Sequence, residues 1–98
     1  MFFFVKAVNP RPSFHLDMTI EERERIAEHV AYWSEKARQG IAVVFGPVMD
    51  TSKVFGMGVY RVEDEAHMRR LLEQDPAKGL LKYEVFAMAT AVLGAVSG

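Results

Sequence analysis

The sequence predicts an α+β domain whose strands and helices follow the order β, α, β, β, α, β. One observation is a long amphipathic segment, residues 19–40, flanked by short runs of aromatic and β-branched residues. A second is that the strand, helix, strand pattern recurs in the second half with a shorter helix. Strands at both ends of two such halves are typical of the ferredoxin-like split βαβ arrangement, a four-stranded antiparallel sheet with both helices on one face. With 98 residues, the chain should form a single domain spanning 1–98.

The long helix is marked at both ends. Thr19, followed three residues later by Glu22, fits a capping box, in which a hydroxyl and a carboxylate each accept a free backbone N–H. Gly40 can adopt the left-handed conformation that ends a helix. At about 100° per residue, one stripe of this helix is apolar. Its members are Ile26, Ala27, Val30, Trp33, Ser34 and Ala37. We therefore expect the helix to pack on the sheet, with Trp33 in the core between them.

His29 lies at the shoulder of this stripe, beside Trp33. A side chain in that position can line a cavity between the helix and the sheet. Periodicity alone favours the alternative, a half-buried boundary residue whose ring nitrogens bind a backbone carbonyl or water.

Four segments have the composition of strands, and they span residues 2–8, 41–46, 54–62 and 83–92. Apolar residues occupy both alternating faces, as is typical of strands buried on both sides. Gly46 and Pro47 are expected to end the second strand. Because the two helices cover only one face, we expect a second copy of the chain to cover the other, giving a homodimer. The tail from Val92 to Ser97 is expected to pack on that partner.

The connection between the first strand and the long helix, residues 9–18, contains two prolines and is long enough to suggest a binding role. Arg11, Phe14 and His15 are its candidate ligand contacts. The alternative is a plain connecting loop with a solvated His15.

The second helix is predicted to begin after Asp64, which can cap it, and to run to Gln74. Asp75 would continue its apolar stripe by spacing, so a carboxylate points inward just before Pro76. Such a carboxylate costs free energy unless it has a partner. The alternative is a carboxylate that accepts from nearby backbone N–H groups in an Asp-Pro turn.

Composition excludes several function classes. Twelve basic and 13 acidic residues give a net charge of -1, which offers no electrostatic footprint for nucleic acid or an anionic membrane. No apolar run approaches the span of a bilayer, and the opening MFFFVK lacks the features of a signal peptide, so a cytoplasmic location is expected. The absence of cysteine excludes disulfides and thiolate chemistry.

No cofactor is predicted. Gly56-Met57-Gly58 lies inside a strand and lacks the third glycine of a dinucleotide fingerprint. His29 has no histidine or carboxylate three or four residues away along its helix, so a metal site is not expected either.

A neutral imidazole such as that of His29 can accept a proton near neutral pH. A carboxylate such as Asp75, bonded to its other nitrogen, would fix the tautomer and stabilise the imidazolium. No serine or cysteine occupies a nucleophile motif, so proton abstraction, elimination or isomerisation fits better than acyl transfer. Tyr60 is a candidate polar neighbour, and Trp33 a candidate substrate contact.

The sequence resembles the YCII-related family over nearly the whole chain. The resemblance is carried by His29, Gly40 eleven residues later, Gly46-Pro47, Gly56 or Gly58, and Asp75-Pro76 followed by Gly79. It implies a dimeric α+β barrel of the ferredoxin-like kind, with His29 and Asp75 as the active-site pair. It also implies lyase chemistry, which in that family includes dehydrochlorination of aromatic compounds. The chain departs from the family pattern in the longer loop at residues 9–18 and in the Ala-Thr-Ala-Val end of its last strand.

The opening MFFFVKAVNP also resembles the muconolactone isomerases, a related barrel family. Three classes of function therefore remain. The first is a small cofactor-independent lyase or isomerase acting on a small molecule through His29 and Asp75. The second is a non-catalytic small-molecule-binding domain that uses the same cavity, and the third is a structural dimer module.

Overall fold

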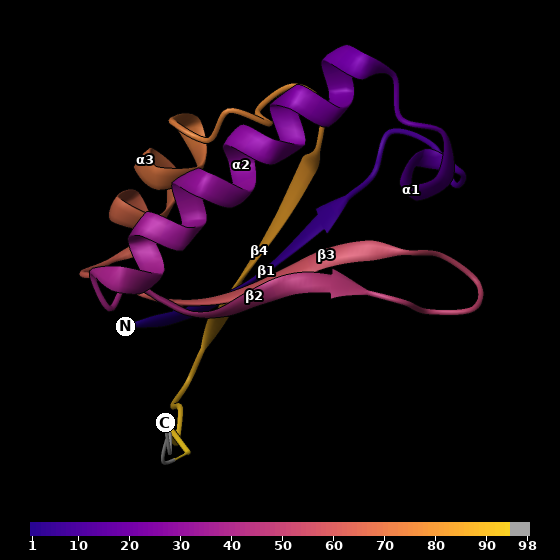
Figure 1. The fold of residues 1–98 in the computed structure, drawn as a ribbon. Helices are drawn as coiled ribbons and strands as arrows, with labels where there is room; N and C mark the ends of the chain where they lie inside the picture. The colour runs from indigo at the N-terminus through magenta and orange to yellow at the C-terminus, as the bar shows by residue number, and fades with distance from the viewer. Residues whose placement is uncertain (95–98) are drawn as a thin grey trace.

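The computed structural model describes residues 1–94 of the chain. Its sheet consists of β1 (Phe2–Val8), β2 (Ala42–Val48), β3 (Phe55–Arg61) and β4 (Lys82–Met88). All neighbouring strands are antiparallel, and their order is β2-β3-β1-β4. One face is covered by α2 (Ile20–Arg38) and α3 (Glu65–Glu73), while the short helix α1 (Phe14–Asp17) precedes α2 (Figure 1). The predicted ferredoxin-like fold class is confirmed.

The side chains that alternate along β1 decide where the core lies. Phe3, Val5 and Ala7 point toward the helices and are buried, whereas the residues between them are only half-buried. Trp33 of α2 is 1% exposed and packs in the same cluster as Phe3 and Met68, the latter from α3. The prediction that Trp33 belongs to the core between α2 and the sheet is confirmed.

Local capping explains where the helices begin and end. The Thr19 hydroxyl accepts from the Glu22 N–H, and the Glu22 carboxylate accepts from the Thr19 N–H, which completes the predicted capping box. Gly40 has a φ of 80°, the left-handed conformation expected after α2. The Asp64 carboxylate caps α3 by accepting from the His67 N–H.

The apolar stripe predicted for α2 is only partly buried, and this differs from the expectation of continuous packing on the sheet. Trp33 is the buried residue of this helix, whereas Val30 remains 46% exposed. Val30 and Ile26 border a cavity between α2 and the sheet, which leaves this part of the stripe only partly covered.

The predicted ends of two strands were wrong. β2 does not stop at Gly46 but continues through Pro47 to Val48, because β2 is an edge strand, where a missing N–H is tolerated. β4 ends at Met88 and does not reach Val92. Met88 pairs with Phe2, the first residue of β1, so β1 provides no further strand residue for β4 to pair with.

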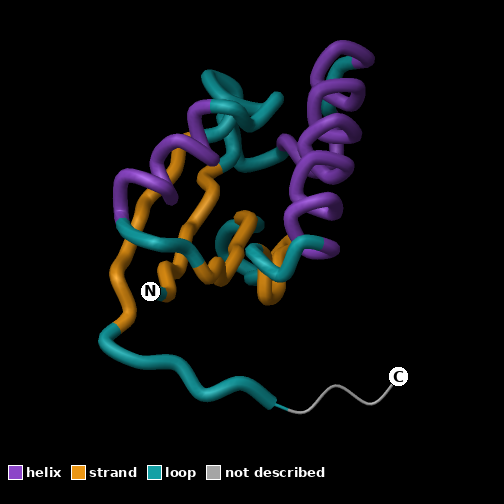
Figure 2. Tube along the Cα trace, turned by 90° about the vertical axis from the view of Figure 1, so that its left-hand side faces the viewer, coloured by secondary structure: helices purple, strands orange, loops and turns teal. Residues whose placement is uncertain are grey.

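The face of the sheet opposite the helices is apolar and uncovered in the single chain. Phe4 and Phe86 contact each other there with ring centroids 6.0 Å apart, and Phe86 is 49% exposed. The segment after β4 leads away from the helices (Figure 2). In the tail predicted to contact a partner, Val92 is 94% and Leu93 48% exposed, and residues 95–97 lie outside the described residues. Within residues 1–94, no helix is long and apolar enough to cross a membrane.

Candidate functional site

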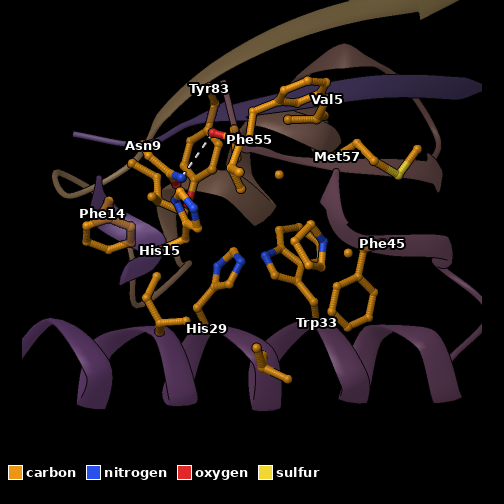
Figure 3. Close-up of a pocket in the computed structure, with 18 of the residues that line it drawn as sticks. Val5, Asn9, Phe14, His15, His29, Trp33, Phe45, Phe55, Met57 and Tyr83 are labelled. Atoms are coloured by element: carbon orange, nitrogen blue, oxygen red, sulfur yellow. Dashed lines mark hydrogen bonds between the residues drawn. The ribbon is translucent and has the colours of Figure 1, made fainter. Parts of the chain in front are cut away.

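A cavity of about 680 Å³ lies between α2 and the sheet, with α1 forming part of its wall (Figure 3). This volume is within the range typical of small-molecule sites. Its wall is mainly apolar, and the aromatic residues that contribute to it are Phe14, Trp33, Phe45, Phe55, Tyr60 and Tyr83. The two histidines in the lining are His15 and His29. The fold therefore offers a mostly apolar chamber with few polar groups.

Asp75 is the buried charged residue beside this cavity, and its side chain is 0% exposed. It lies two residues after the end of α3, close enough that the helical spacing that aligns it with the apolar stripe turns the carboxylate inward as predicted. Its oxygens accept from Trp33 Nε1 at 2.8 Å, the Tyr83 hydroxyl at 2.6 Å and the backbone N–H of Ala77 at 2.9 Å. His29 Nδ1 lies 2.8 Å from both oxygens.

These partners decide the charge of Asp75. Burial by itself raises the pKa of the Asp75 carboxyl, whereas the hydrogen bonds from His29, Tyr83 and the Ala77 N–H lower it. The lowering contributions prevail, so the pKa of Asp75 lies below its ordinary value of 3.8. Asp75 is therefore a carboxylate at neutral pH and acts only as an acceptor.

This fixes the tautomer of His29. Because Asp75 can only accept, His29 Nδ1 must carry the proton, and the lone pair of the neutral ring lies on Nε2. No group within residues 1–94 makes a hydrogen bond to Nε2. In that part of the chain, every buried side-chain nitrogen has a hydrogen-bond partner, so Nε2, which has none, is accessible to solvent. The His29 side chain is 17% exposed and lines the cavity. Nε2 is thus a basic nitrogen accessible from the cavity.

The tyrosines beside the pair remain protonated. Burial, followed by the hydrogen bond to Asp75, raises the pKa of Tyr83 well above its ordinary value. Burial and the charge of Asp75 raise the pKa of Tyr60 in the same direction, and raise that of Tyr32 to about 12. All three hydroxyls are therefore neutral donors at physiological pH.

Gly58 makes room for Tyr60. A Cβ on Gly58 would lie 2.0 Å from the Tyr60 hydroxyl oxygen, so the phenol occupies the space above the glycine. The same ring packs against Trp33, with centroids 4.6 Å apart. The group that closely approaches Gly58 is thus a side chain of the same strand, and not another backbone or a ligand.

The turn that holds Asp75 is tied to α2. Arg25 donates from Nε to the carbonyl of Pro76 at 3.2 Å and from its guanidinium to the carbonyl of Lys78. Arg25 and His29 are four residues apart on one helix, so the element that carries His29 also binds the turn after Asp75. The hydrogen bonds of Arg25 therefore help to hold the His29 imidazole near the Asp75 carboxylate.

The structure brings together most of the residues predicted for the site. His29 and Asp75 meet as expected, and Trp33, Tyr60 and Phe14 line the cavity.

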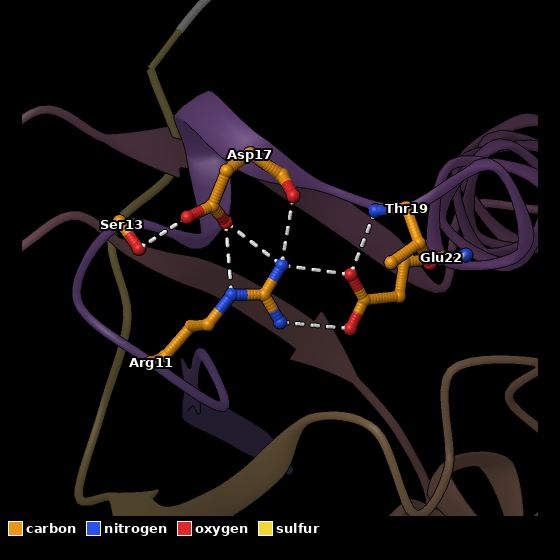
Figure 4. Close-up of polar contacts among 5 residues, drawn as sticks. All are labelled: Arg11, Ser13, Asp17, Thr19 and Glu22. Atoms are coloured by element: carbon orange, nitrogen blue, oxygen red, sulfur yellow. Dashed lines mark hydrogen bonds and ion pairs between the residues drawn. The ribbon is translucent and has the colours of Figure 1, made fainter.

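Arg11 is the exception among the predicted contacts. It does not line the cavity, because its guanidinium binds Glu22 at 2.8 and 2.9 Å and Asp17 at 2.8 Å (Figure 4). Its hydrogen bonds lower the pKa of Glu22 to about 2. We therefore no longer assign Arg11 as a ligand contact.

Sequence reasoning missed Tyr83 as a site residue and treated it only as the start of a strand. Its hydroxyl donates to Asp75, and its ring lines the cavity. The available signal was indirect: a buried carboxylate needs donors, and Tyr83 follows the Asp-Pro turn by a few residues. In the part of the chain that the structure describes, no three histidine or acidic side chains gather as a metal site would require.

Comparison with known proteins shows a likeness in fold. No family model matches the sequence, and no curated protein matches it. Among solved structures, the chain is similar to 5-chloro-2-hydroxyhydroquinone dehydrochlorinase (TftG) from Burkholderia phenoliruptrix AC1100, in complex with 2,5-dihydroxybenzoquinone. The TM-score is 0.69 at 17% identity, and the alignment covers 93% of this chain and 96% of that one. The two proteins share an α+β ferredoxin-like fold.

Proposed function

We propose that this protein is a cofactor-independent lyase or isomerase in which His29 acts as a general base on a small cyclic substrate. The observation that carries the proposal is the imidazole of His29. Its Nδ1 donates to the buried, ionised Asp75, while its Nε2 is accessible from an apolar cavity. A base held by an orienting carboxylate is the arrangement that general acid–base catalysis requires.

In an elimination, Nε2 of His29 takes a proton from an acidic C–H or O–H bond of the substrate. The electron pair left behind forms a new double bond, and the leaving group departs with its own bonding pair. The resulting imidazolium is stabilised by the Asp75 carboxylate, 2.8 Å from Nδ1. In an isomerisation, the imidazolium instead returns the proton to another atom of the same substrate. The largely apolar wall limits water and strengthens the attraction between the two charges.

The substrate class follows from the cavity and from the structural neighbour. Aromatic side chains suit a flat ring, and the neighbour is a dehydrochlorinase bound to a dihydroxybenzoquinone. We therefore propose that this chain acts on a hydroxylated aromatic or quinonoid compound, and that it is a YCII-like protein. A non-catalytic domain that binds such a compound in the same cavity is the second candidate, because the cavity is present whether or not His29 moves a proton.

A homodimer is part of this proposal. The sheet face opposite the helices carries the half-buried Phe4 in contact with the exposed Phe86, and such a face is expected to associate with another surface. A second copy that places the same face against it would bury both.

The test compares turnover with binding. Wild type, His29→Gln and the control His67→Gln, on α3 outside the cavity lining, are incubated with 5-chloro-2-hydroxyhydroquinone, and chloride release is measured. Loss of a general base should slow the reaction by about 10²- to 10⁴-fold in His29→Gln and leave the control unchanged. Equal rates in His29→Gln and wild type would refute the role of His29. Binding without chloride release by the wild type would favour the non-catalytic alternative.

A further inference from the structure

We propose that His15 is a second ligand-binding residue, which donates a hydrogen bond to an acidic oxygen of a flat, ring-shaped ligand in the cavity. The inference rests on the proposed function for the location of the ligand, and it adds the residue that selects acidic compounds over neutral ones. His15 lies on α1, the short helix within the connection between β1 and α2.

The charges around the cavity single out this residue. Among the described residues that line it there is no lysine, arginine, aspartate or glutamate, so His15 and His29 are its two side chains able to carry positive charge. The indole N–H of Trp33 and the hydroxyl of Tyr83 already donate to Asp75. The Asn9 amide N–H donates to the carbonyl of Val54 at 3.2 Å. The side-chain donors left for an acidic ligand are therefore an N–H of His15, the neutral Tyr60 hydroxyl and the second amide N–H of Asn9, and of these three only His15 can carry positive charge.

His15 keeps its donor capacity unused in the described part of the chain. It is exposed, and neither ring nitrogen makes a hydrogen bond within residues 1–94. By contrast, His29 is bound to Asp75, and His67 accepts from the backbone N–H of Glu63. An imidazole always has at least one N–H to offer, in either charge state. The alternative for His15 is a histidine that only contacts water.

The backbone that carries His15 is held on both sides. Phe14, the preceding residue, is 3% exposed and packs with Ala7 and Leu81. On the other side of His15, the Asp17 carboxylate accepts from both Arg11 and Ser13, and Arg11 also donates to Glu22 at the start of α2 (Figure 4). Because α1 is fixed before any ligand arrives, a contact from His15 needs little further ordering of the chain.

The occupant that these groups fit is a flat ring carrying acidic oxygens. Phe14, Trp33 and Phe45 offer apolar surface for the ring, while His15 from α1 and His29 from α2 supply polar contacts from two different elements (Figure 3). Dihydroxyquinones have this character, because their hydroxyl groups are vinylogous acids and lose a proton readily.

The experiment measures binding by calorimetry with two probes of similar shape, 2,5-dihydroxybenzoquinone, which is acidic, and hydroquinone, which is neutral. His15→Ala should lower the affinity for the acidic probe about tenfold, the lower end expected for a charge-assisted hydrogen bond. It should lower the affinity for the neutral probe less than about twofold. Leu16→Ala is the matched control, because Leu16 is the next residue on α1 and also lines the cavity but has no donor. It should affect both probes alike. Circular dichroism checks that each variant is folded.

Equal losses for the two probes in His15→Ala, or no loss, would overturn the inference, as would a wild type that fails to bind 2,5-dihydroxybenzoquinone. Failure of the general-base proposal looks different: His29→Gln then keeps the rate of chloride release, while the His15-dependent preference for the acidic probe persists. In turnover, His15→Ala should raise KM and leave kcat unchanged.

Discussion

Replacing Asp75 with asparagine tests the central feature of the site, because it removes the charge and keeps the shape. The carboxylate presents one oxygen to the Ala77 N–H and the other to the indole N–H of Trp33, and both donors are fixed in position. An asparagine has one acceptor oxygen, so its NH₂ group must face one of these donors whichever way the amide turns.

The cost can be worked out from these contacts. Each buried donor left without an acceptor costs roughly 1–3 kcal/mol, and the charge-assisted hydrogen bonds to the remaining oxygen also become weaker. We expect Asp75→Asn to lower the free energy of unfolding by about 3 kcal/mol at pH 7. For a domain of this length, that corresponds to a decrease in Tm of about 15 °C. Such a loss is a large part of the stability of a typical domain.

The measurement is urea denaturation followed by the fluorescence of Trp33, the single tryptophan of the chain. Asp50→Asn is the control, because it makes the same change at an exposed carboxylate bonded to Ser52, and it should leave the unfolding curve almost unchanged. A difference of less than about 0.5 kcal/mol between Asp75→Asn and wild type would refute the description of Asp75 as the ionised acceptor of these groups.

The pH dependence gives a second check. Because the pKa of folded Asp75 lies below its ordinary value of 3.8, the ionised carboxylate stabilises the fold fully above that value. This stabilisation is lost as the pH falls through the lowered pKa of the folded state. The difference in stability between wild type and Asp75→Asn should therefore not shrink between pH 7 and about 5, and should shrink only in stronger acid. A difference that already shrinks near pH 6 would contradict a lowered pKa.

Three further predictions concern the fold and the assembly. Trp33→Ala should lower the free energy of unfolding by about 3–5 kcal/mol, measured by circular dichroism, and a loss under about 1 kcal/mol would contradict its place in the core. Gly58→Ala should cost about 1–3 kcal/mol because its methyl group collides with Tyr60, whereas Gly46→Ala, with nothing within 4 Å, should be nearly neutral; equal effects would refute the close contact. Wild type should sediment as a dimer at micromolar concentration and Phe86→Arg as a folded monomer, while a monomeric wild type would remove the argument from the apolar face.

Several elements could be predicted from the sequence because their causes are local. The limits of α2 follow from Thr19, Glu22 and Gly40, which act through neighbouring backbone groups and need no other part of the chain. The inward direction of Asp75 follows from helical spacing alone. The order of elements, read from composition and periodicity, was sufficient for the fold class.

Strand ends and the short helix α1 depended on contacts that the sequence does not display. β4 stops at Met88 because its partner β1 begins at Phe2, and a strand cannot continue without a neighbour to pair with. α1 is held in place because Phe14 is buried against Ala7 and Leu81 and because Arg11 donates to Glu22. Both outcomes depend on groups that are distant in sequence.

The site itself shows this division clearly. The sequence placed His29 at a helix shoulder and Asp75 on the inner side of another helix, so each residue was a candidate on local grounds. The tertiary structure decided that they meet across 46 residues and that Trp33 and Tyr83 complete the set of donors. It also decided that Arg11 binds Glu22 instead of facing the cavity. Side-chain periodicity fixes a direction relative to one element, whereas a hydrogen bond needs two elements placed to within a few tenths of an ångström, and only the packing of α2, α3 and the sheet sets that distance.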